Sequence, residues 1–382
     1  MKIGIDIRTL RDVMTGIGRY VSKMVEAQVK SNDGNEYILF YTNLSGKPRQ
    51  GIPAAGNFRL ASYRWPGKMM TALWAYGNHP KVERFTGPID VFHSPSFQVP
   101  PSRKAARVFT VFDLIAIAFP DMAIPSSVRH FRPRIKHYVS RADIIVAISK
   151  ATAGDIVNIL DVPPEKIKVV YPGTTPIMKT EPEKIGEVLN KYSIRKDYIL
   201  FVSRLDPRKN LSRLFKAFEF SNLYKDFDMV VAGPKGWHME EMFQTWRNVK
   251  CRDQIKWLYF VNDEELAALY NGATFFIYPS LVEGFGLPIL EAMSAGCPVL
   301  TSNLSSMPEA AGEAALYIDP YDIASIADGM QRLASNSDLR SRLSSLGYDR
   351  TALFTWEHVA QEMTKIYTYA REVAKVRMGT DS

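Results

Sequence analysis

The chain has 382 residues, of which 46% are hydrophobic and 23% charged, which excludes a disordered protein and favours two globular domains. Its two cysteines, Cys251 and Cys297, exclude a disulfide framework and a cysteine-based zinc site, and they fit a reducing cytoplasm. The net charge of +8 is uneven: residues 1–172 hold 24 basic and 13 acidic residues (+11), and residues 173–382 hold 24 and 27 (−3).

The first half of the chain alternates short apolar runs with amphipathic stretches. Residues 2–7 (KIGIDI) begin a strand at once, without an apolar stretch of signal-peptide length, and a helix is expected over about 18–29. Further strands are expected at 36–42, 90–95, 106–113, 142–149 and 166–172. Their short, Val- and Ile-rich sequences are typical of a parallel sheet covered on both faces.

A second series of the same kind begins at Tyr198. Strands are expected at 198–203, 228–233, 255–260, 273–280 and 298–303, with helices at 211–221 and 355–373. No run of about 18 apolar residues occurs, so no membrane-spanning helix is expected. The expected parts are an N-terminal Rossmann-like domain (1–175), a charged, proline-containing linker (176–197), a second domain (198–358) and a C-terminal helical segment (359–382).

Two such series predict an α/β protein with two doubly wound domains that face each other across a cleft. In open α/β sheets, ligands bind beyond the carboxyl ends of the strands. The loops that follow the strands therefore supply the candidate site residues.

The first of these loops, in RDVMTGIGRY (11–20), precedes a helix. Gly16 and Gly18 allow close approach of a ligand to the backbone, and a helix N-terminus favours an anion. The pattern is not a complete G-x-G-x-x-G, because Val21 stands at the third position, so a loop that only turns the chain remains the alternative.

The second loop, SRLDPRKN (203–210), follows the strand that opens the second series. Arg204 can grip a phosphate with two parallel hydrogen bonds, and Lys209 adds a compact charge. A charged surface turn is the alternative interpretation.

The third loop lies in FFIYPSLVEGFGLPILEAM, which reads as strand, loop and helix, with Pro288 at the first helical position. Glu283 falls in the loop, and Glu291 falls about one turn inside the helix. The two carboxylates are therefore not an acid/base dyad on one helical face, but acceptors for different hydroxyls of an extended ligand. For Glu291, a solvated or salt-bridged helix residue is the alternative.

Together these motifs resemble the GT-B glycosyltransferases of family 4, which are retaining enzymes that use nucleotide sugars. The resemblance covers nearly the whole chain and rests on TGIGRY, VSRLDPRKN, VVAGPKGW, VNDEELAALYNGA and the E-x₇-E pattern from Glu283 to Glu291. Bacterial mannosyltransferase-like members, which build polysaccharides and glycolipids, are the most similar.

The resemblance implies a GT-B fold and a hexose transfer that needs no metal ion or other cofactor. The donor would be a nucleotide-diphosphate sugar such as GDP-mannose or a UDP-sugar, and the acceptor a glycan or a lipid-linked glycan. A GT-B glycosyl phosphorylase or a sugar-nucleotide epimerase is the alternative. A dinucleotide-dependent oxidoreductase is disfavoured by the incomplete glycine fingerprint, and no nucleic-acid-binding module is present.

The resemblance also implies roles for individual residues. Arg204 and Lys209 would bind the donor diphosphate, and Glu291 the ribose hydroxyls. Glu283 would bind the sugar hydroxyls, helped by the backbone amides of the loop around it, and Gly16 would let the first loop close over the diphosphate. The donor-binding loop residues are Gly18, Gly284, Phe285, Gly286 and Leu287.

One position departs from the family pattern. Phe112 stands where the family usually has a histidine, directly before Asp113, which is a candidate for orienting the acceptor. His93 ends a neighbouring strand, and it is either a substitute contact to the sugar or acceptor or a hydrogen-bonded strand-end residue.

The first half also combines aromatic residues in 63–79 with eight basic residues in 101–141. This pattern suits an anionic membrane surface or a lipid-linked acceptor, so a cytoplasmic protein, peripheral at the inner face of the membrane, is expected. Core packing of the aromatic residues and a solvated basic surface are the alternative.

Overall fold

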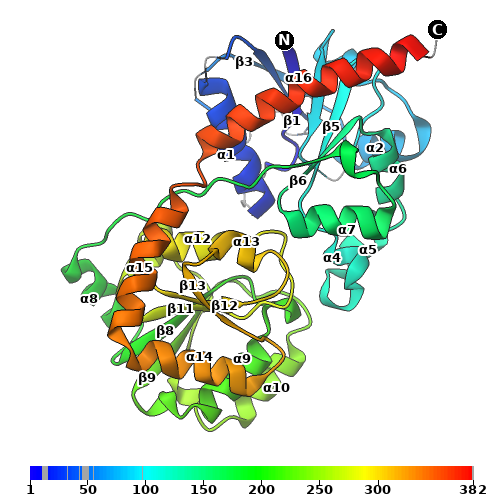
Figure 1. Ribbon diagram of the computed structural model, residues 1–382. Coiled ribbons are helices and arrows are strands. Elements are labelled where there is room, and N and C mark those ends of the chain that lie inside the picture. Colours follow the sequence, from blue (N-terminus) through cyan, green and yellow to red (C-terminus); the bar gives the residue numbers. More distant parts are fainter. Residues whose placement is uncertain are drawn as a thin grey trace. The chain divides into compact units, whose positions relative to one another are not determined.

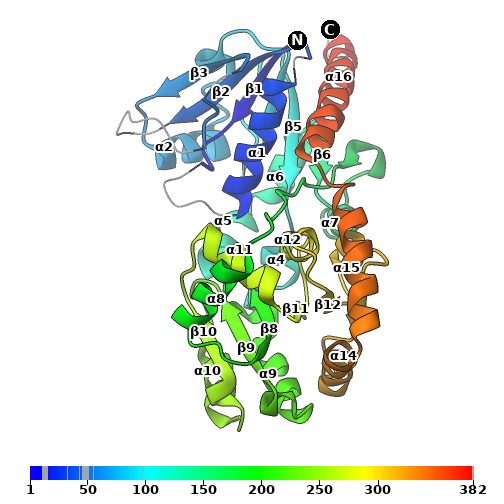
Figure 2. The same cartoon turned by 90° about the vertical axis from the view of Figure 1, so that its left-hand side faces the viewer.

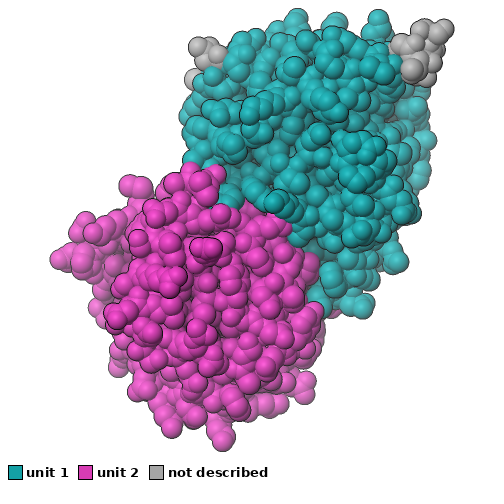
Figure 3. All heavy atoms as spheres, viewed as in Figure 1, with its two compact units in different colours: residues 1–173, 354–382 teal, residues 174–353 magenta. Residues whose placement is uncertain are grey.

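The computed structural model describes residues 1–10, 16–31, 33–42, 44, 51–54, 56–96 and 98–380. The chain forms two compact units, shown in Figures 1 and 3: unit 1 comprises residues 1–173 and 354–382, and unit 2 comprises residues 174–353. The last helix thus belongs to unit 1, although it follows unit 2 in the sequence.

Unit 1 is built on a parallel sheet, which in the described part of the chain has seven strands in the order β3-β2-β1-β4-β5-β6-β7. All seven strands are parallel. From β1 the chain adds β2 and β3 on one side of the sheet and then β4 to β7 on the other side, so the strand order reverses between β1 and β4. Their bounds are β1 Lys2–Asp6, β2 Glu36–Thr42, β3 Phe58–Tyr63, β4 Val91–Ser94, β5 Ala106–Val111, β6 Ile144–Ala147 and β7 Ile167–Val169.

Helices cover this sheet: α1 Gly16–Lys30, α2 Gly67–Ala72, α3 Glu83–Thr86, α4 Ile115–Ala118, α5 Pro125–Phe131, α6 Ile135–Arg141, α7 Lys150–Leu160 and α16 Trp356–Thr380. Shorter turns lie at Leu73–Gly77, Pro120–Met122 and Pro164–Lys166. The long helix α16 packs against α1 and β5, and Figures 1 and 2 show α1 and α16 side by side. Tyr367 of α16 accepts a hydrogen bond from Gln28 of α1 at 2.8 Å inside this contact.

Unit 2 repeats the same architecture. Its parallel sheet, over the described residues, has six strands in the order β10-β9-β8-β11-β12-β13, and the order reverses between β8 and β11. The bounds are β8 Asp197–Val202, β9 Phe227–Ala232, β10 Ile255–Leu258, β11 Phe275–Tyr278, β12 Val299–Ser302 and β13 Ala315–Ile318.

The helices of unit 2 are α8 Pro182–Lys191, α9 Leu211–Phe220, α10 Glu240–Asn248, α11 Asp263–Gly272, α12 Leu287–Ser294, α13 Met307–Ala311, α14 Ile323–Ser335 and α15 Ser337–Thr351. Short turns lie at Pro207–Lys209, Leu223–Lys225 and Arg252–Gln254. The stretch 176–197, expected as a linker, contains α8, which packs against α11 within unit 2. Tyr192 donates a hydrogen bond to Glu265 of α11 at 2.9 Å and helps to hold this stretch on the unit.

The predicted α/β fold with two Rossmann-like parallel sheets is confirmed, and each strand predicted from an apolar run is present. Two strands, β3 and β13, were not predicted. Both are edge strands. β3 (FRLASY) does not form a continuous apolar run: three of its six residues are exposed, two are half-buried and only Ala61 is buried.

Candidate functional site

The reversal of strand order in unit 2 places the loops after β8 and β11 next to each other. The amide of Leu281 donates to the carbonyl of Arg208 at 2.8 Å. The side chain of Asn210 donates to the carbonyls of Pro279 at 3.2 Å and Pro320 at 2.7 Å. These bonds join SRLDPRKN to PSLVEGFG at the carboxyl edge of the sheet, which is where ligands bind in folds of this class.

Glu283 is the centre of this junction, and both of its carboxylate oxygens are hydrogen-bonded. Oε1 accepts from Lys209 Nζ and, at 3.0 Å, from Tyr278 Oη. Oε2 accepts from Arg208 Nη1 at 2.9 Å, and Arg208 Nε donates at 3.0 Å to Asp206. Lys209 is 3% exposed and Glu283 is 8% exposed, so the pair is almost completely removed from water.

The electrostatics of this cluster follow from burial and from the alternation of charge. Burial raises the pKa of Glu283, but Arg208 and Lys209 outweigh it, so the carboxyl has a lowered pKa and is ionised at neutral pH. Burial lowers the pKa of Lys209, and Glu283 opposes that shift. Burial raises the pKa of Asp206, against the attraction of Arg208.

The backbone of Glu283 is fixed as firmly as its side chain. Its amide donates to Ser305 Oγ at 3.2 Å, and its carbonyl accepts from the hydroxyls of Ser305 and Ser306, each at 3.0 Å. A carboxylate held in this way can accept hydrogen bonds from ligand hydroxyls with little loss of side-chain entropy.

Arg204 and Lys209 were predicted to act together, and the structure shows them in different environments. Lys209 is buried in the cluster, whereas Arg204 is exposed. The loop that carries Arg204 lies against the backbone of GPKG: Leu205 donates to the carbonyl of Pro234 at 3.0 Å. A Cβ atom on Gly236 would overlap the carbonyl oxygen of Leu205, so this close contact requires a glycine.

Helix α12 begins directly after Glu283. Gly286 precedes it with a φ of +105°, which favours glycine, and the helix starts at Leu287. Pro288 was predicted to be the first residue of this helix, and the structure places it second. Pro288 has no N–H group, and the amide of Ile289 donates to the carbonyl of Gly286 at 3.0 Å, so the donor that the start of α12 can offer to an anion is the amide of Leu287. Gly284 lies in the same turn, and the Phe285 side chain is buried.

Glu291 is the fifth residue of α12, about one turn inside the helix as predicted. Its Oε2 accepts from Tyr270 Oη of α11 at 3.2 Å, and the side chain is half-buried. It is thus tied to the neighbouring helix and also retains access to solvent.

In unit 1, the predicted glycine loop is only partly described. Residues 11–15 lie outside the described residues, whereas Gly16 begins α1 and Gly18 is buried within it. Among the described residues, apart from the neighbours of Gly16 in the chain and the backbone of its own helix, none comes within 4 Å of where a Cβ on Gly16 would be.

His93 is fully buried, and both of its ring nitrogens are engaged. Nδ1 lies 2.8 Å from Tyr367 Oη, and Nε2 lies 2.8 Å from Thr110 Oγ1. Burial lowers the pKa of His93 to about 3, against a smaller influence of Asp6. This geometry favours the hydrogen-bonded strand-end interpretation over a contact with a sugar or acceptor.

Phe112 and Asp113 follow strand β5. The Phe112 ring packs edge-on against Tyr20 of α1, with ring centroids 5.1 Å apart. Asp113 is half-buried and accepts from the amide of Ile115 at 3.0 Å, at the start of α4. The aromatic side chain thus takes part in packing where the family usually has a histidine.

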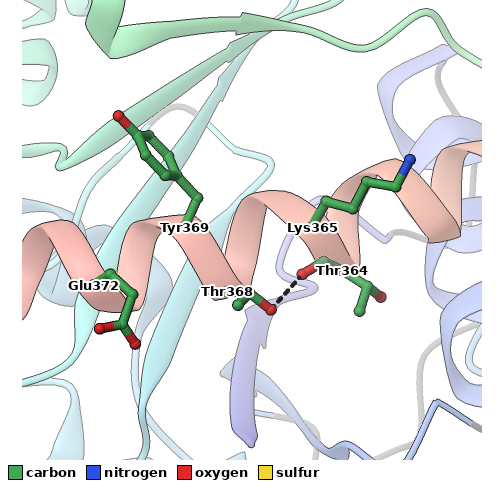
Figure 4. Close-up of a pocket in the computed structure, with 5 residues that line it drawn as sticks. All are labelled: Thr364, Lys365, Thr368, Tyr369 and Glu372. Carbon is green, nitrogen blue, oxygen red and sulfur yellow. Dashed lines mark hydrogen bonds between the residues drawn. The ribbon is translucent and has the colours of Figure 1, made fainter.

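A pocket along α16, shown in Figure 4, is lined by Thr364, Lys365, Thr368, Tyr369 and Glu372 and contains none of the candidate residues. Within the described ranges, no group of three or more His, Cys, Asp or Glu side chains is arranged to hold a metal ion. No helix among those residues is both long and apolar enough to cross a bilayer.

Three members of the cluster were not predicted: Asp206, Arg208 and Tyr278. The signals available in the sequence were the acidic residue followed by two basic residues in DPRK and the tyrosine that ends β11.

Comparisons with known proteins found family matches in both units. Residues 14–176 match the family described as "Glycosyltransferase Family 4", and residues 187–350 match "Glycosyl transferases group 1". The chain is 26% identical over 380 residues to the "O-antigen chain mannosyltransferase B" of Escherichia coli, covering 96% of this chain and 99% of that protein. It is 30% identical over 229 residues to the "Serotype-specific mannosyltransferase WbdA" of Escherichia coli, which is 58% of this chain but only 28% of that protein.

Solved structures show the same fold. Sucrose-phosphate synthase from Thermosynechococcus elongatus superposes with a TM-score of 0.72 at 18% identity, covering 97% of this chain and 98% of that one. HepE of Anabaena in complex with UDP-glucose superposes with a TM-score of 0.72 at 16% identity, covering 97% and 100%. With both units matched in sequence and in fold, the chain belongs to the GT-B glycosyltransferases of family 4.

Proposed function

We propose that this glycosyltransferase is a retaining enzyme that moves a hexose, with mannose favoured, from a nucleotide-diphosphate sugar to a glycan or lipid-linked acceptor in polysaccharide or glycolipid synthesis. The observation that carries the proposal is the fixed, ionised Glu283 between Lys209 and Arg208, directly before the start of α12 and joined to the loop that carries the exposed Arg204. Unit 2 would bind the donor, and unit 1 would lie on the acceptor side.

Each group in unit 2 has a task in such a transfer. Charge develops on the diphosphate as the bond to the sugar breaks, and Arg204, Lys209 and the Leu287 amide at the start of α12 can stabilise it without a metal ion. Glu283 accepts hydrogen bonds from sugar hydroxyls, and Glu291 accepts from the ribose. With the leaving phosphate helping to deprotonate the acceptor, the protein supplies mainly positioning and electrostatic stabilisation.

The choice of sugar rests on the relatives. One of them is named as an O-antigen chain mannosyltransferase and another as a serotype-specific mannosyltransferase. HepE was solved with UDP-glucose, so GDP-mannose and UDP-sugars are the donors to compare.

A thermal-shift screen with GDP-mannose, UDP-glucose, GDP and UDP tests this proposal. A specific ligand at 100 times its Kd stabilises the folded state by about 2.7 kcal/mol, so we expect one nucleotide series to raise the melting temperature by several degrees. Release of nucleoside diphosphate only in the presence of an acceptor would identify transfer and exclude epimerisation. Absence of any shift at millimolar concentrations would contradict a nucleotide-sugar donor.

The basic surface of unit 1 suits a cytoplasmic enzyme that works at the inner face of a membrane. Arg129, Arg132 and Lys136 are exposed, and Arg134 lies over the ring of Tyr76, which is 76% exposed. The aromatic stretch is only partly available, because two of its large side chains, Met70 and Trp74, are buried in the core of unit 1.

Co-sedimentation with vesicles of anionic lipid at low salt tests this surface. We expect binding that weakens with salt and that is lost when Arg129, Arg132 and Lys136 are all changed to Gln. A matched change of three exposed lysines on unit 2, Lys216, Lys225 and Lys250, should leave it intact. Equal loss in both triple variants would indicate a general charge effect and contradict a membrane-binding surface on unit 1.

A further inference from the structure

The cluster around Glu283 holds four charged side chains in a row of alternating sign: Asp206, Arg208, Glu283 and Lys209. Arg208 joins the two carboxylates, with 3.0 Å from its Nε to Asp206 Oδ1 and 2.9 Å from its Nη1 to Glu283 Oε2. Asp206 and Glu283 are 5% and 8% exposed. A planar guanidinium can hold two acceptors at fixed angles, which a lysine cannot do.

The Lys209 ammonium cannot bind Glu283 and the donor diphosphate equally well at the same time. In the structure its ammonium donates to Glu283 and to Tyr278 and lies 4.7 Å from the centre of the Tyr278 ring. In the proposed function the same ammonium binds the donor diphosphate. When it turns to the phosphate, Glu283 loses one of its two cationic partners while it is buried, and an unpaired buried carboxylate is strongly unfavourable.

We propose that Arg208 is a positioning residue that keeps the Glu283 carboxylate ionised and in place when Lys209 turns to the diphosphate. This inference rests on the proposed function. Asp206 contributes by holding Arg208 from the other side, so that the guanidinium stays directed at Glu283 without any contribution from Lys209. Arg208 itself need not touch the donor.

The lowered pKa of Glu283 agrees with this role. Burial raises that pKa, and among the influences that lower it, the charge of Arg208 is the largest, ahead of Lys209. Removing Arg208 should therefore move the protonation of Glu283 to higher pH, whether or not Lys209 is engaged elsewhere.

A double-mutant cycle on stability tests, in the ligand-free protein, whether Arg208 supports Glu283 when Lys209 does not. The variants are Arg208→Gln, Lys209→Met and the double change, with unfolding followed in urea. We expect the double variant to lose more than the sum of the single losses, by about tenfold in the unfolding equilibrium constant, because only then is Glu283 unpaired. In a Glu283→Gln background, where no carboxylate is left to be unpaired, this excess should disappear. Additivity within about threefold in the original background would overturn the proposal.

A kinetic readout separates positioning from a general structural role. In Arg208→Gln we expect the acid limb of the kcat/KM profile to move to higher pH, and in Arg208→Lys we expect it to stay near its original place because the charge is retained. Arg252→Gln, an exposed arginine of the same unit, is the control and should change neither limb nor turnover. An unmoved acid limb in Arg208→Gln would also overturn the proposal.

The two experiments keep this inference distinct from the proposed function. If no nucleotide sugar binds the wild-type protein, the proposed function fails, and the stability cycle still decides whether Arg208 supports Glu283 in the absence of Lys209.

Discussion

Replacing Glu283 with alanine is expected to abolish transfer and to destabilise unit 2. The carboxylate is the acceptor for Lys209, which is 3% exposed, so its removal leaves a buried ammonium without its ion-pair partner. Breaking one partner of a buried pair costs about 3–5 kcal/mol. Loss of a fixed polar contact at the reacting sugar should lower kcat at least about 100-fold. Urea unfolding and nucleoside diphosphate release measure the two effects.

The pH dependence of this variant has a definite sign. Burial already lowers the pKa of Lys209, and Glu283 is the largest influence that opposes the shift. Without Glu283 the pKa falls further, so above that value the unfolded chain binds a proton that the folded protein does not. Stability then rises with pH. The deficit relative to wild type should therefore shrink as the pH is raised from 7 towards the pKa of an unfolded lysine, about 10.4.

A double change separates the lost charge pair from lost packing. Lys209→Met in addition to Glu283→Ala removes the unpaired ammonium and leaves Arg208 with Asp206 at 3.0 Å. The double variant should be more stable than Glu283→Ala and equally inactive. If it proves less stable than the single variant, the buried ammonium is not the source of the loss.

The fold was largely predictable, because fully buried strands leave a local signature. Strands such as β2 and β11 consist of consecutive apolar residues, and each was found close to its expected bounds. Strand β3 lacks this signature, because three of its six residues are exposed and only Ala61 is buried. That is why β3 was missed.

Most residues of the site were predicted from the sequence, but the contacts between them were not. Lys209 and Glu283 are 74 positions apart in the sequence, and their ion pair depends on β8 pairing with β11, which no local pattern reveals. Arg208 looked like one more charge in a surface turn. The role that we propose for it rests on its two ion pairs, one with Asp206 and one with Glu283.

His93 illustrates the same limit in unit 1. From the sequence it was either a ligand contact or a hydrogen-bonded residue at the end of a strand. Its partner Tyr367 lies 274 positions away on α16, so the choice depended on where the last helix docks. Because the His93 imidazole is buried, it should make the free energy of unfolding depend on pH.

The protein is expected to lose stability as the pH falls below about 6.5, and His93 is expected to cause much of that loss. Burial keeps the imidazole neutral in the folded state, with a pKa of about 3, whereas an unfolded histidine titrates near 6.5. The unfolded chain therefore gains a proton first, and stability present above pH 6.5 is lost progressively towards pH 3. Between pH 7 and pH 5 the difference amounts to about 2 kcal/mol.

Urea unfolding of wild type, His93→Gln and His358→Gln at pH 7, 6 and 5 measures this contribution. Glutamine keeps a donor and an acceptor for Tyr367 and Thr110 but cannot be protonated, so His93→Gln should lose about 2 kcal/mol less than wild type over this range. His358 is exposed on the same helix, and its replacement should leave the wild-type slope unchanged. Because Tyr367 also accepts from Gln28 of α1, protonation of His93 acts on the contacts that hold α16 to unit 1. Equal pH slopes in wild type and His93→Gln would show that the loss arises elsewhere.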